Sequence, residues 1–249
     1  MTRISVELVP RDIEILTAEV KEIKEKLPMI DFINIPDLLS CEMRSWEGAN
    51  IAHQYFDTVV PHLRAMDFDF TKELPIKDKF REYNIKEVLV VEGDPPQSML
   101  YQVYPTISTD IIKKISEEMP EITVYAGIDQ YRSSMKEEEY RIRRKQLAGA
   151  KGFFTQPFFD IRYLEMYADL LDGLDIYWGV SPVLSERSVS YWRNKNNVIF
   201  PKNFEPTLEW NIDFAQKVIA FARKHNHNVY LMPIKAKIMP YLEGVFAGE

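Results

Sequence analysis

The chain alternates short apolar runs with amphipathic segments, and this alternation constrains its fold more than any other feature. Eight runs have the length of a strand, and several are unbroken, which is typical of strands buried on both faces. Their starts lie about 30 residues apart, the length of one βα unit. The runs are Ile4–Pro10, Phe32–Asp37, Val59–Met66, Val88–Gly93, Thr123–Gly127, Phe153–Phe158, Ile176–Val180 and Val229–Pro233.

Between these runs, apolar residues recur every three or four positions among charged ones. This spacing predicts surface helices that each bury one stripe of side chains. We expect the last of these helices to end at Asn226 or His227. The stripes consist of Ile13, Leu16, Val20, Ile23 and Leu27; Ile111, Ile112, Ile115 and Met119; Leu164, Tyr167, Leu171 and Leu174; and Ile212, Ala215, Val218, Ile219 and Ala222.

Eight βα units in 249 residues predict a single (β/α)8 TIM barrel, with a doubly wound open sheet as the alternative. No Ser/Gly-rich linker, low-complexity segment or abrupt change in composition divides the chain. We therefore predict that residues 1–249 form one catalytic domain. The gap before the last strand is longer than the others, and we expect an extra helix or loop around Val198–Thr207.

The nine glycines exclude two kinds of nucleotide site. No two are separated by one residue and no two are five apart, so neither a G-x-G-x-x-G loop nor a G-x-x-x-x-G-K loop exists. Any nucleotide must therefore be bound without either of these glycine-rich loops. The single Cys41 likewise excludes an intramolecular disulfide and any multi-cysteine metal site.

Charge and hydropathy narrow the class of protein further. The chain has 31 Lys and Arg against 38 Asp and Glu, a net charge of −7, which disfavours non-specific nucleic-acid binding. No apolar run approaches a membrane span, and the first ten residues are too charged for a signal peptide. We expect a cytoplasmic protein that binds neither nucleic acid nor a membrane.

The polar residues at the ends of the predicted strands are candidates for chemistry, because a barrel of this kind has its active site there. Glu7 is the most informative, since it interrupts an otherwise apolar strand. Burial would raise the pKa of Glu7 and keep it protonated, as a general acid near neutral pH requires. The alternative is a structural carboxylate paired with Arg64 or another buried base.

Three further segments are compatible with a site but also with structural roles. Gly93-Asp94 follows a strand, where glycine permits a close backbone approach or simply a tight turn. The amide of Gln156 both donates and accepts, as recognition of a heterocycle edge requires, although the aromatics beside it suit a core. The run Lys136–Lys145 is acidic first and basic later, which is typical of a solvated helix; the alternative is that its bases reach a phosphate.

The histidines give little evidence of a metal. His62 lies within a predicted strand, whereas His225 and His227 flank a predicted helix end. His62 has no second His, Cys or carboxylate at ligand spacing, so we predict no metal site.

Taken in order, these segments resemble the methylenetetrahydrofolate reductase family. Each matching motif is short, but the ordered set is specific and extends over nearly the whole chain. The strongest match is the segment that contains Gln156. The motifs are Val6–Pro10, with the family's catalytic Glu; Pro61–Leu63; Gly93–Pro96; Leu147–Ala150 followed by Phe154–Asp160; and Gly179–Val183.

The resemblance implies a barrel that binds FAD and reduces 5,10-methylenetetrahydrofolate to 5-methyltetrahydrofolate, with NADH or NADPH as the hydride donor. This reaction belongs to one-carbon metabolism and methionine biosynthesis. Glu7 would protonate the folate nitrogen as the five-membered ring opens, Asp94 would lie near both flavin and pterin, and Gln156 would bind the folate. The cofactor-binding positions implied are His62, Asp94, Ala126, Tyr131, Arg132, Glu138 and Lys145, with Lys145 at the flavin phosphates and Glu138 by the sugar chain.

Three stretches depart from the family pattern. Pro36-Asp37 replaces the usual Thr-Tyr, Gly127–Arg132 replaces a Pro-Glu and His-Pro-Glu pattern, and Glu186 stands where an aromatic commonly stacks. The residues expected to bind folate therefore match the family pattern better than those expected to contact the flavin and the nicotinamide. The alternatives are a reductase with another electron donor, a non-catalytic folate- or flavin-binding barrel, a subunit that needs a partner protein, and a pterin-handling methyltransferase. A homo-oligomer or a partner electron-transfer protein is compatible with the sequence.

Overall fold

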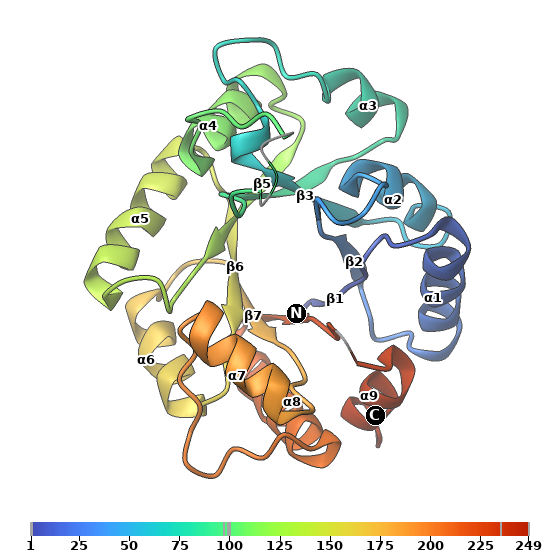
Figure 1. The fold of residues 1–249 in the computed structure, drawn as a ribbon, viewed down its shortest axis with the longest axis vertical. Helices are drawn as coiled ribbons and strands as arrows, with labels where there is room; N and C mark the ends of the chain where they lie inside the picture. Colours follow the sequence, from blue (N-terminus) through green and yellow to red (C-terminus); the bar gives the residue numbers. More distant parts are fainter. Residues whose placement is uncertain (1, 97, 99–100, 235, 249) are drawn as a thin grey trace.

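Eight parallel strands close into a barrel with helices around it (Figure 1). The structure is a computed structural model that describes residues 2–96, 98, 101–234 and 236–248. The strands follow one another around the barrel in chain order, and β1 closes it by pairing with β8. The predicted (β/α)8 barrel is thereby confirmed, and the open sheet is excluded. The strands are β1 (Ile4–Glu7), β2 (Phe32–Ile35), β3 (Val59–Arg64), β4 (Glu87–Val91), β5 (Thr123–Ile128), β6 (Gly152–Pro157), β7 (Ile176–Val180) and β8 (Asn228–Leu231).

Each strand begins where the sequence predicts or one residue earlier, but several end sooner than predicted. The first apolar run continues through Leu8 and Val9, although β1 stops at Glu7. These additional residues are apolar because the loops that follow the strands also pack against the helices. Apolar character therefore locates a strand in this chain better than it locates the strand's end.

Alternate residues of each strand face opposite sides of the barrel wall, which explains the unbroken apolar runs. The outward-facing residues, such as Ile33 on β2 and Leu63 on β3, join the large core between strands and helices. The inward-facing residues fill the barrel interior with a separate apolar cluster. That interior cluster consists of Phe32, Val60, Leu89, Tyr125, Phe154, Tyr177, Tyr230 and Met232.

Arg3 closes the N-terminal end of the barrel. Its guanidinium lies 4.4 Å from the ring centroid of Phe32 and donates hydrogen bonds to the hydroxyls of Tyr177 at 2.9 Å and Tyr125 at 3.3 Å. It also pairs with Glu87 at 3.5 Å. Because this end is filled, a ligand must enter from the opposite end, where the strands finish; we call that end the mouth.

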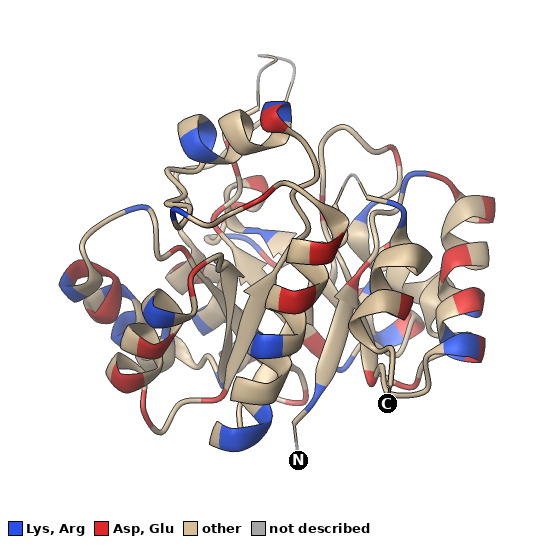
Figure 2. Ribbon diagram, turned by 90° about the horizontal axis from the view of Figure 1, so that it is seen from below, with Lys and Arg blue, Asp and Glu red and all other residues tan. Residues whose placement is uncertain are grey.

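The helices form the outer layer and carry most of the charge, whereas the strands are largely uncharged (Figure 2). Within the described ranges, no helix combines the length and the apolar character needed to cross a membrane. The helices are α1 (Ile13–Lys26), α2 (Ser45–Ala52), α3 (Lys77–Glu82), α4 (Ser108–Glu118), α5 (Met135–Ala148), α6 (Ile161–Leu170), α7 (Glu186–Lys195), α8 (Leu208–His225) and α9 (Ile238–Val245), with a 3₁₀ turn at Ala65–Asp67.

The amphipathic stripes locate α1, α4, α6 and α8, with one correction. Ile13 opens the predicted stripe of α1 but is 61% exposed, because the helix begins there and its buried face starts with Leu16. The end of α8 is as predicted, with Asn226 in the left-handed conformation at φ 56°. The longer gap before β8 contains α7 and an irregular segment whose Val198 packs in a small aromatic-rich core.

Candidate active site

Four polar side chains from three neighbouring strands and β8 meet at the mouth. Glu7 ends β1 and is opposite Asn34 in the β1–β2 pairing, while His62 lies on β3 and Tyr230 on β8. All four are buried, with Glu7 only 8% exposed. The closed barrel is what brings them together, because β1 and β8 pair although Glu7 and Tyr230 are 223 residues apart.

Glu7 is held by Tyr230 and not by a base. The Tyr230 hydroxyl donates a hydrogen bond to Oε2 of Glu7. Burial raises the pKa of Glu7 to about 7, and the hydrogen bond from Tyr230 acts in the opposite direction. The proposed pairing with Arg64 is wrong, since Arg64 instead contacts Asp67 at 3.3 Å and the Asp94 carbonyl at 2.8 Å. Glu7 can therefore hold or release a proton near neutral pH.

His62 is the nearest titratable neighbour of Glu7 on the β3 side. Its Nδ1 lies 3.9 Å from Oε2 of Glu7, which is too long for a hydrogen bond. Burial lowers the pKa of His62 to about 3, so the ring is neutral and supplies no positive charge to the carboxylate. Its Nε2 lies 3.3 Å from Nδ2 of Asn34, and Oδ1 of Asn34 is buried with no hydrogen-bond partner among the described residues. A ligand donor or a water would satisfy that acceptor.

The β4 loop brings Asp94 to the mouth through its backbone. Gly93 has a φ of +88°, and a Cβ there would lie 3.1 Å from Cβ of Arg64, so glycine allows the two loops to approach. The Arg64 guanidinium then holds the Asp94 carbonyl, while the Asp94 side chain is exposed. In the described structure no hydrogen bond or ion pair joins Asp94 to Glu7; Asp94 is placed as a rim residue of the mouth.

Gln156 occupies the rim on the β6 side. Its side chain is exposed, and its backbone carbonyl accepts a 2.7 Å hydrogen bond from the side chain of Gln130. The β6–β7 pairing is irregular between Phe154 and Pro157. At Gly179 a Cβ would lie 2.5 Å from the Thr155 carbonyl, so the two strands approach closely only because residue 179 is glycine. The exposed Gln156 amide is therefore available to a ligand, and the closely packed strands β6 and β7 hold its backbone in place.

The other residues assigned to a cofactor are turned toward the protein. The Ala126 side chain lies in the outer core, away from the barrel interior. The Tyr131 hydroxyl donates a 2.9 Å hydrogen bond to the Pro157 carbonyl, and Arg132 contacts Asp129 at 3.2 Å. These positions can offer a ligand only their backbone or, for Arg132, an exposed and already paired guanidinium.

Glu138 and Lys145 on α5 are likewise engaged at the end of β5. The Lys145 ammonium donates a 2.6 Å hydrogen bond to the Gly127 carbonyl, and burial lowers its pKa. The buried carboxylate of Glu138 accepts a 3.3 Å hydrogen bond from the Asp129 amide, and burial raises its pKa. Both side chains support the β5–α5 connection.

Two of the three arginines of α5 are also paired, which bears on how well this helix fits a diphosphate. Arg141 contacts Glu137 at 2.7 Å and Arg143 contacts Glu139 at 2.6 Å, both along the helix. The arrangement is that of a charged helix surface stabilised by pairs four residues apart. In this arrangement Arg141, Arg143 and Lys145 do not fit the diphosphate of FAD, because protein acceptors already occupy them. Arg144 is a further base of α5; it is exposed and its guanidinium lies 6.0 Å from the ring centroid of Tyr140.

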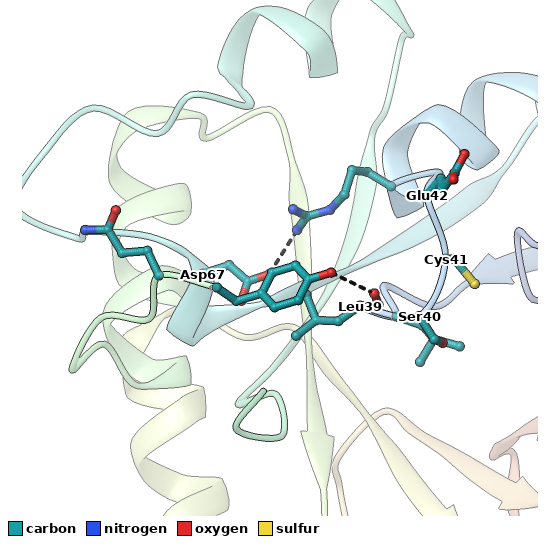
Figure 3. Close-up of a pocket in the computed structure, with 9 residues that line it drawn as sticks. Leu39, Ser40, Cys41, Glu42 and Asp67 are labelled. Atoms are coloured by element: carbon teal, nitrogen blue, oxygen red, sulfur yellow. Dashed lines mark hydrogen bonds and ion pairs between the residues drawn. The ribbon is translucent and has the colours of Figure 1, made fainter. Parts of the chain in front are cut away.

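A cavity of about 470 Å³ opens beside the mouth between the loops that follow β2, β3 and β4. Figure 3 shows Asp67 on one side of this cavity facing the loop that carries Leu39 and Ser40. Arg44 also lines it and contacts Asp37 at 2.6 Å and Asp67 at 3.0 Å. Asp37, one of the departures from the family pattern, is thus the acceptor for a bidentate arginine that joins the two loops.

The sequence analysis missed Tyr230, Arg44 and Asp67. Tyr230 lies in an apolar run, and only its inward position on β8 distinguishes it. Counting alternate residues along that run would place Tyr230 and Met232 on the same face of the strand. Arg44 and Asp67 lie in loops, where no periodicity predicts that they meet.

Comparisons with known proteins agree with the barrel and with one family. The profile of the family described as methylenetetrahydrofolate reductase matches residues 9–230. The 5,10-methylenetetrahydrofolate reductase of Buchnera aphidicola subsp. Schizaphis graminum is 23% identical over 150 residues, which cover 58% of this chain and 51% of that protein. The Escherichia coli K12 protein of the same name is 24% identical over 146 residues, 57% of this chain and 49% of its own. The chain thus spans about half the length of these relatives.

Two solved structures show the same fold. A protein from Clostridium thermocellum, otherwise uncharacterised, binds two copies of 5-methyl-5,6,7,8-tetrahydrofolic acid; it superposes with a TM-score of 0.62 at 14% identity over 99% of this chain and 93% of its own. A 2,3-dimethylmalate lyase superposes with a TM-score of 0.61 at 10% identity, over 97% of this chain and 77% of its own. At these identities the likeness shows the barrel alone.

The family match includes most of the site residues but not Glu7. The matched stretch begins two residues after Glu7 and ends at Tyr230, so the environment of Glu7 comes from the structure and not from the match. The match covers most of the chain, including the rim residues Asp94 and Gln156. The chain therefore belongs to the methylenetetrahydrofolate reductase family.

Proposed function

We propose that the chain reduces 5,10-methylenetetrahydrofolate to 5-methyltetrahydrofolate, with Glu7 as the acid. The observation that carries this proposal is a buried carboxyl at the mouth, with a pKa of about 7, that accepts a hydrogen bond from Tyr230 and is paired with no Lys or Arg among the described residues. A general acid works best when its pKa lies near the operating pH. The two reductases that the chain resembles carry the same activity in their names.

The reaction requires one hydride and one proton. The hydride reaches the methylene carbon, the bond between that carbon and N10 breaks, and the methyl group stays on N5. The electron pair of the broken bond goes to N10, which takes a proton from Glu7. Asp94 and Gln156 stand at the rim and supply polar contacts for the pterin. Binding of a methylfolate by the Clostridium thermocellum barrel supports a folate at such a mouth.

FAD is the cofactor that we propose, with NADH or NADPH as its reductant. When bound, FAD supplies a carrier that accepts a hydride from the nicotinamide and gives it to the folate. Under this proposal the isoalloxazine ring would be held near His62 on β3 and Asp94 after β4, which both lie at the mouth. The diphosphate would have to replace protein acceptors at Lys145, Arg141 or Arg143, because these are paired in the structure. We therefore assign no step of the reaction to α5.

Substitution of the acid tests the proposal. Glu7→Gln should lower turnover of methylenetetrahydrofolate by about 100-fold or more, because general acids contribute on that scale. Glu19→Gln is the matched control: Glu19 is also a carboxyl whose pKa burial raises, but it lies on α1 outside the barrel. Steady-state assays with NADH and with NADPH measure both variants. Full turnover in Glu7→Gln would refute the acid role, and a visible spectrum before and after added FAD tests the cofactor.

The second candidate is a folate-binding barrel that needs a partner protein, or a second copy of itself, for its electrons. The observation that favours it is the occupied state of Arg141, Arg143 and Lys145 on α5. This candidate predicts tight binding of 5-methyltetrahydrofolate by calorimetry and no turnover with NADH or NADPH and added FAD. Turnover by the isolated protein would exclude it.

A further inference from the structure

Tyr230 is the hydrogen-bond donor to the proposed acid, and its own position is fixed by packing. Its side chain is 4% exposed, and its ring meets the ring of Phe154 edge-on with centroids 5.2 Å apart. The centroid of the His62 ring lies 6.3 Å from that of Tyr230. A buried ring packed against both neighbours has little room to swing its hydroxyl away, so the contact with Oε2 of Glu7 is a fixed feature of the barrel.

We propose that Tyr230 is a positioning residue for Glu7: it occupies Oε2, leaves Oε1 to carry the transferable proton, and stabilises the carboxylate once that proton has left. This inference rests on the proposed function, because it says which oxygen of the acid carries the proton and what stabilises the carboxylate after proton transfer. It adds a residue from β8, which pairs with β1, to a buried group otherwise contributed by β1, β2 and β3.

The charge of Glu7 decides how strong the hydrogen bond from Tyr230 is. A hydrogen bond to a charged acceptor is roughly twice as strong as one between neutral groups, so this contact strengthens when Glu7 ionises. Burial and the neighbouring carboxyl raise the pKa of Tyr230 well above its usual value, so the hydroxyl keeps its proton and remains a donor. Proton release by Glu7 is therefore made easier by the group that orients it.

The other groups that face Glu7 do not supply this stabilisation. His62 from β3 is neutral and 3.9 Å away. Asn34 from β2 is uncharged and directs its Nδ2 to His62. Arg64 is engaged with Asp67 and the Asp94 carbonyl. Among the described residues, Tyr230 alone is recorded as donating to the Glu7 side chain.

The test is Tyr230→Phe, which keeps the packed ring and removes the donor. Infrared titration of the folded, substrate-free protein follows the protonated carboxyl band, assigned to Glu7 by its loss in Glu7→Gln. We expect the pKa of Glu7 to rise by about one unit, the difference between a charged and a neutral hydrogen bond. The alkaline limb of the kcat profile should move upward by the same amount, because the protonated acid is the active form. Turnover on the plateau should fall by about tenfold, since Glu7 becomes a weaker acid.

Tyr241→Phe is the matched control. Tyr241 on α9 is also fully buried, and its hydroxyl has no hydrogen-bond partner among the described residues. It should leave the Glu7 titration and the kcat profile unchanged. An unchanged Glu7 titration in Tyr230→Phe, or a loss of activity equal at every pH, would overturn the positioning role. If the wild-type protein lacks turnover but Tyr230→Phe still raises the pKa of Glu7 in the infrared titration, the proposed function is refuted and the contact between Tyr230 and Glu7 is established.

Discussion

At the residue scale, Glu7 and His62 form a neutral pair whose two pKa shifts oppose each other. Burial raises the pKa of Glu7 from 4.5 to about 7 and lowers that of His62 from 6.5 to about 3. Folding therefore makes Glu7 bind a proton more tightly and makes His62 bind one more weakly. Between about pH 4.5 and 6.5 folding adds a proton to Glu7 and removes one from His62. The contributions of the two groups to the slope of the free energy of unfolding with pH therefore cancel.

Single substitutions should reveal how Glu7 and His62 each change the free energy of unfolding with pH. In Glu7→Gln the His62 contribution remains, and the free energy of unfolding should rise with pH between about pH 3 and 6.5. In His62→Gln the Glu7 contribution remains, and stability should fall as pH rises from about 4.5 to 7. Each slope should approach 1.4 kcal/mol per pH unit where one proton is exchanged.

Urea unfolding at several pH values measures these slopes directly. The wild-type curve supplies the reference, because all other groups titrate alike in the three proteins. Equal slopes in wild type and both variants would show that Glu7 and His62 keep ordinary pKa values in the folded protein.

The sequence identifies Glu7 as a candidate because a lone carboxyl in an apolar strand stands out against its neighbours. It cannot identify Tyr230, because other inward-facing tyrosines occur in this barrel and the contact of Tyr230 with Glu7 depends on closure between the first and last strands. The same limit applies to Asp37 and Arg44, whose pairing depends on how one loop folds back. Residues that act through long-range contacts are the ones that sequence pattern leaves out.

At the element scale, the closeness of β6 and β7 shapes the rim around Gln156. A Cβ at Gly179 would lie 2.5 Å from the Thr155 carbonyl and 2.8 Å from the Gln156 carbonyl. These are backbone atoms, so the strands themselves would have to separate. We expect Gly179→Ala to lower the free energy of unfolding by about 2 kcal/mol, as overpacking does, and to weaken folate binding through Gln156.

Gly127→Ala is the control for this prediction. Gly127 also lies at an inward position near a strand end, but a Cβ there would meet only Cγ1 of Val91 at 3.4 Å, an ordinary contact. Its stability should therefore stay close to wild type in chemical denaturation. Equal stability of the two variants would mean that β6 and β7 can move apart without loss.

Helices with a long amphipathic stripe were predicted from the sequence, and the shortest ones were not. The stripe of α8 extends from Ile212 to Ala222 and fixes its place, whereas α3 has six residues and one buried apolar side chain, Phe80. In contrast, α9 carries a stripe, which the sequence analysis did not identify, at Ile238, Tyr241, Leu242 and Val245. No such stripe separates α2 from a loop. Helices α2 and α3 form because the barrel offers them a surface, which is information that their own residues do not contain.

At the scale of the whole molecule, a ligand that enters the mouth should stabilise the entire barrel, because all strands share one closed sheet. At a concentration of 100 times its Kd, 5-methyltetrahydrofolate should add about 2.7 kcal/mol. For a chain of this size that corresponds to a rise in Tm of roughly 5–10 °C.

Gln156→Ala should reduce this ligand-dependent rise while leaving the Tm of the free protein unchanged, since the side chain is exposed. Gln54→Ala, another exposed glutamine but near the end of α2, serves as the control and should behave as wild type. Thermal unfolding at several folate concentrations measures all three proteins. A full shift in Gln156→Ala would exclude Gln156 from the folate site.

Closure of the barrel also has a consequence for the order of events during synthesis. The backbone amide of Arg3 bonds to the side chain of Asn228, and Tyr230 completes the surroundings of Glu7 from the same strand. A ribosome makes β1 first and β8 last, so the first strand must wait for nearly the whole chain to emerge before its second edge is covered. Until then Glu7 lacks Tyr230 and the barrel wall that buries it. A nascent chain that stops before β8 would therefore have a carboxyl with the ordinary acidity of a solvated glutamate, and the acid proposed here comes into existence only with the last strand.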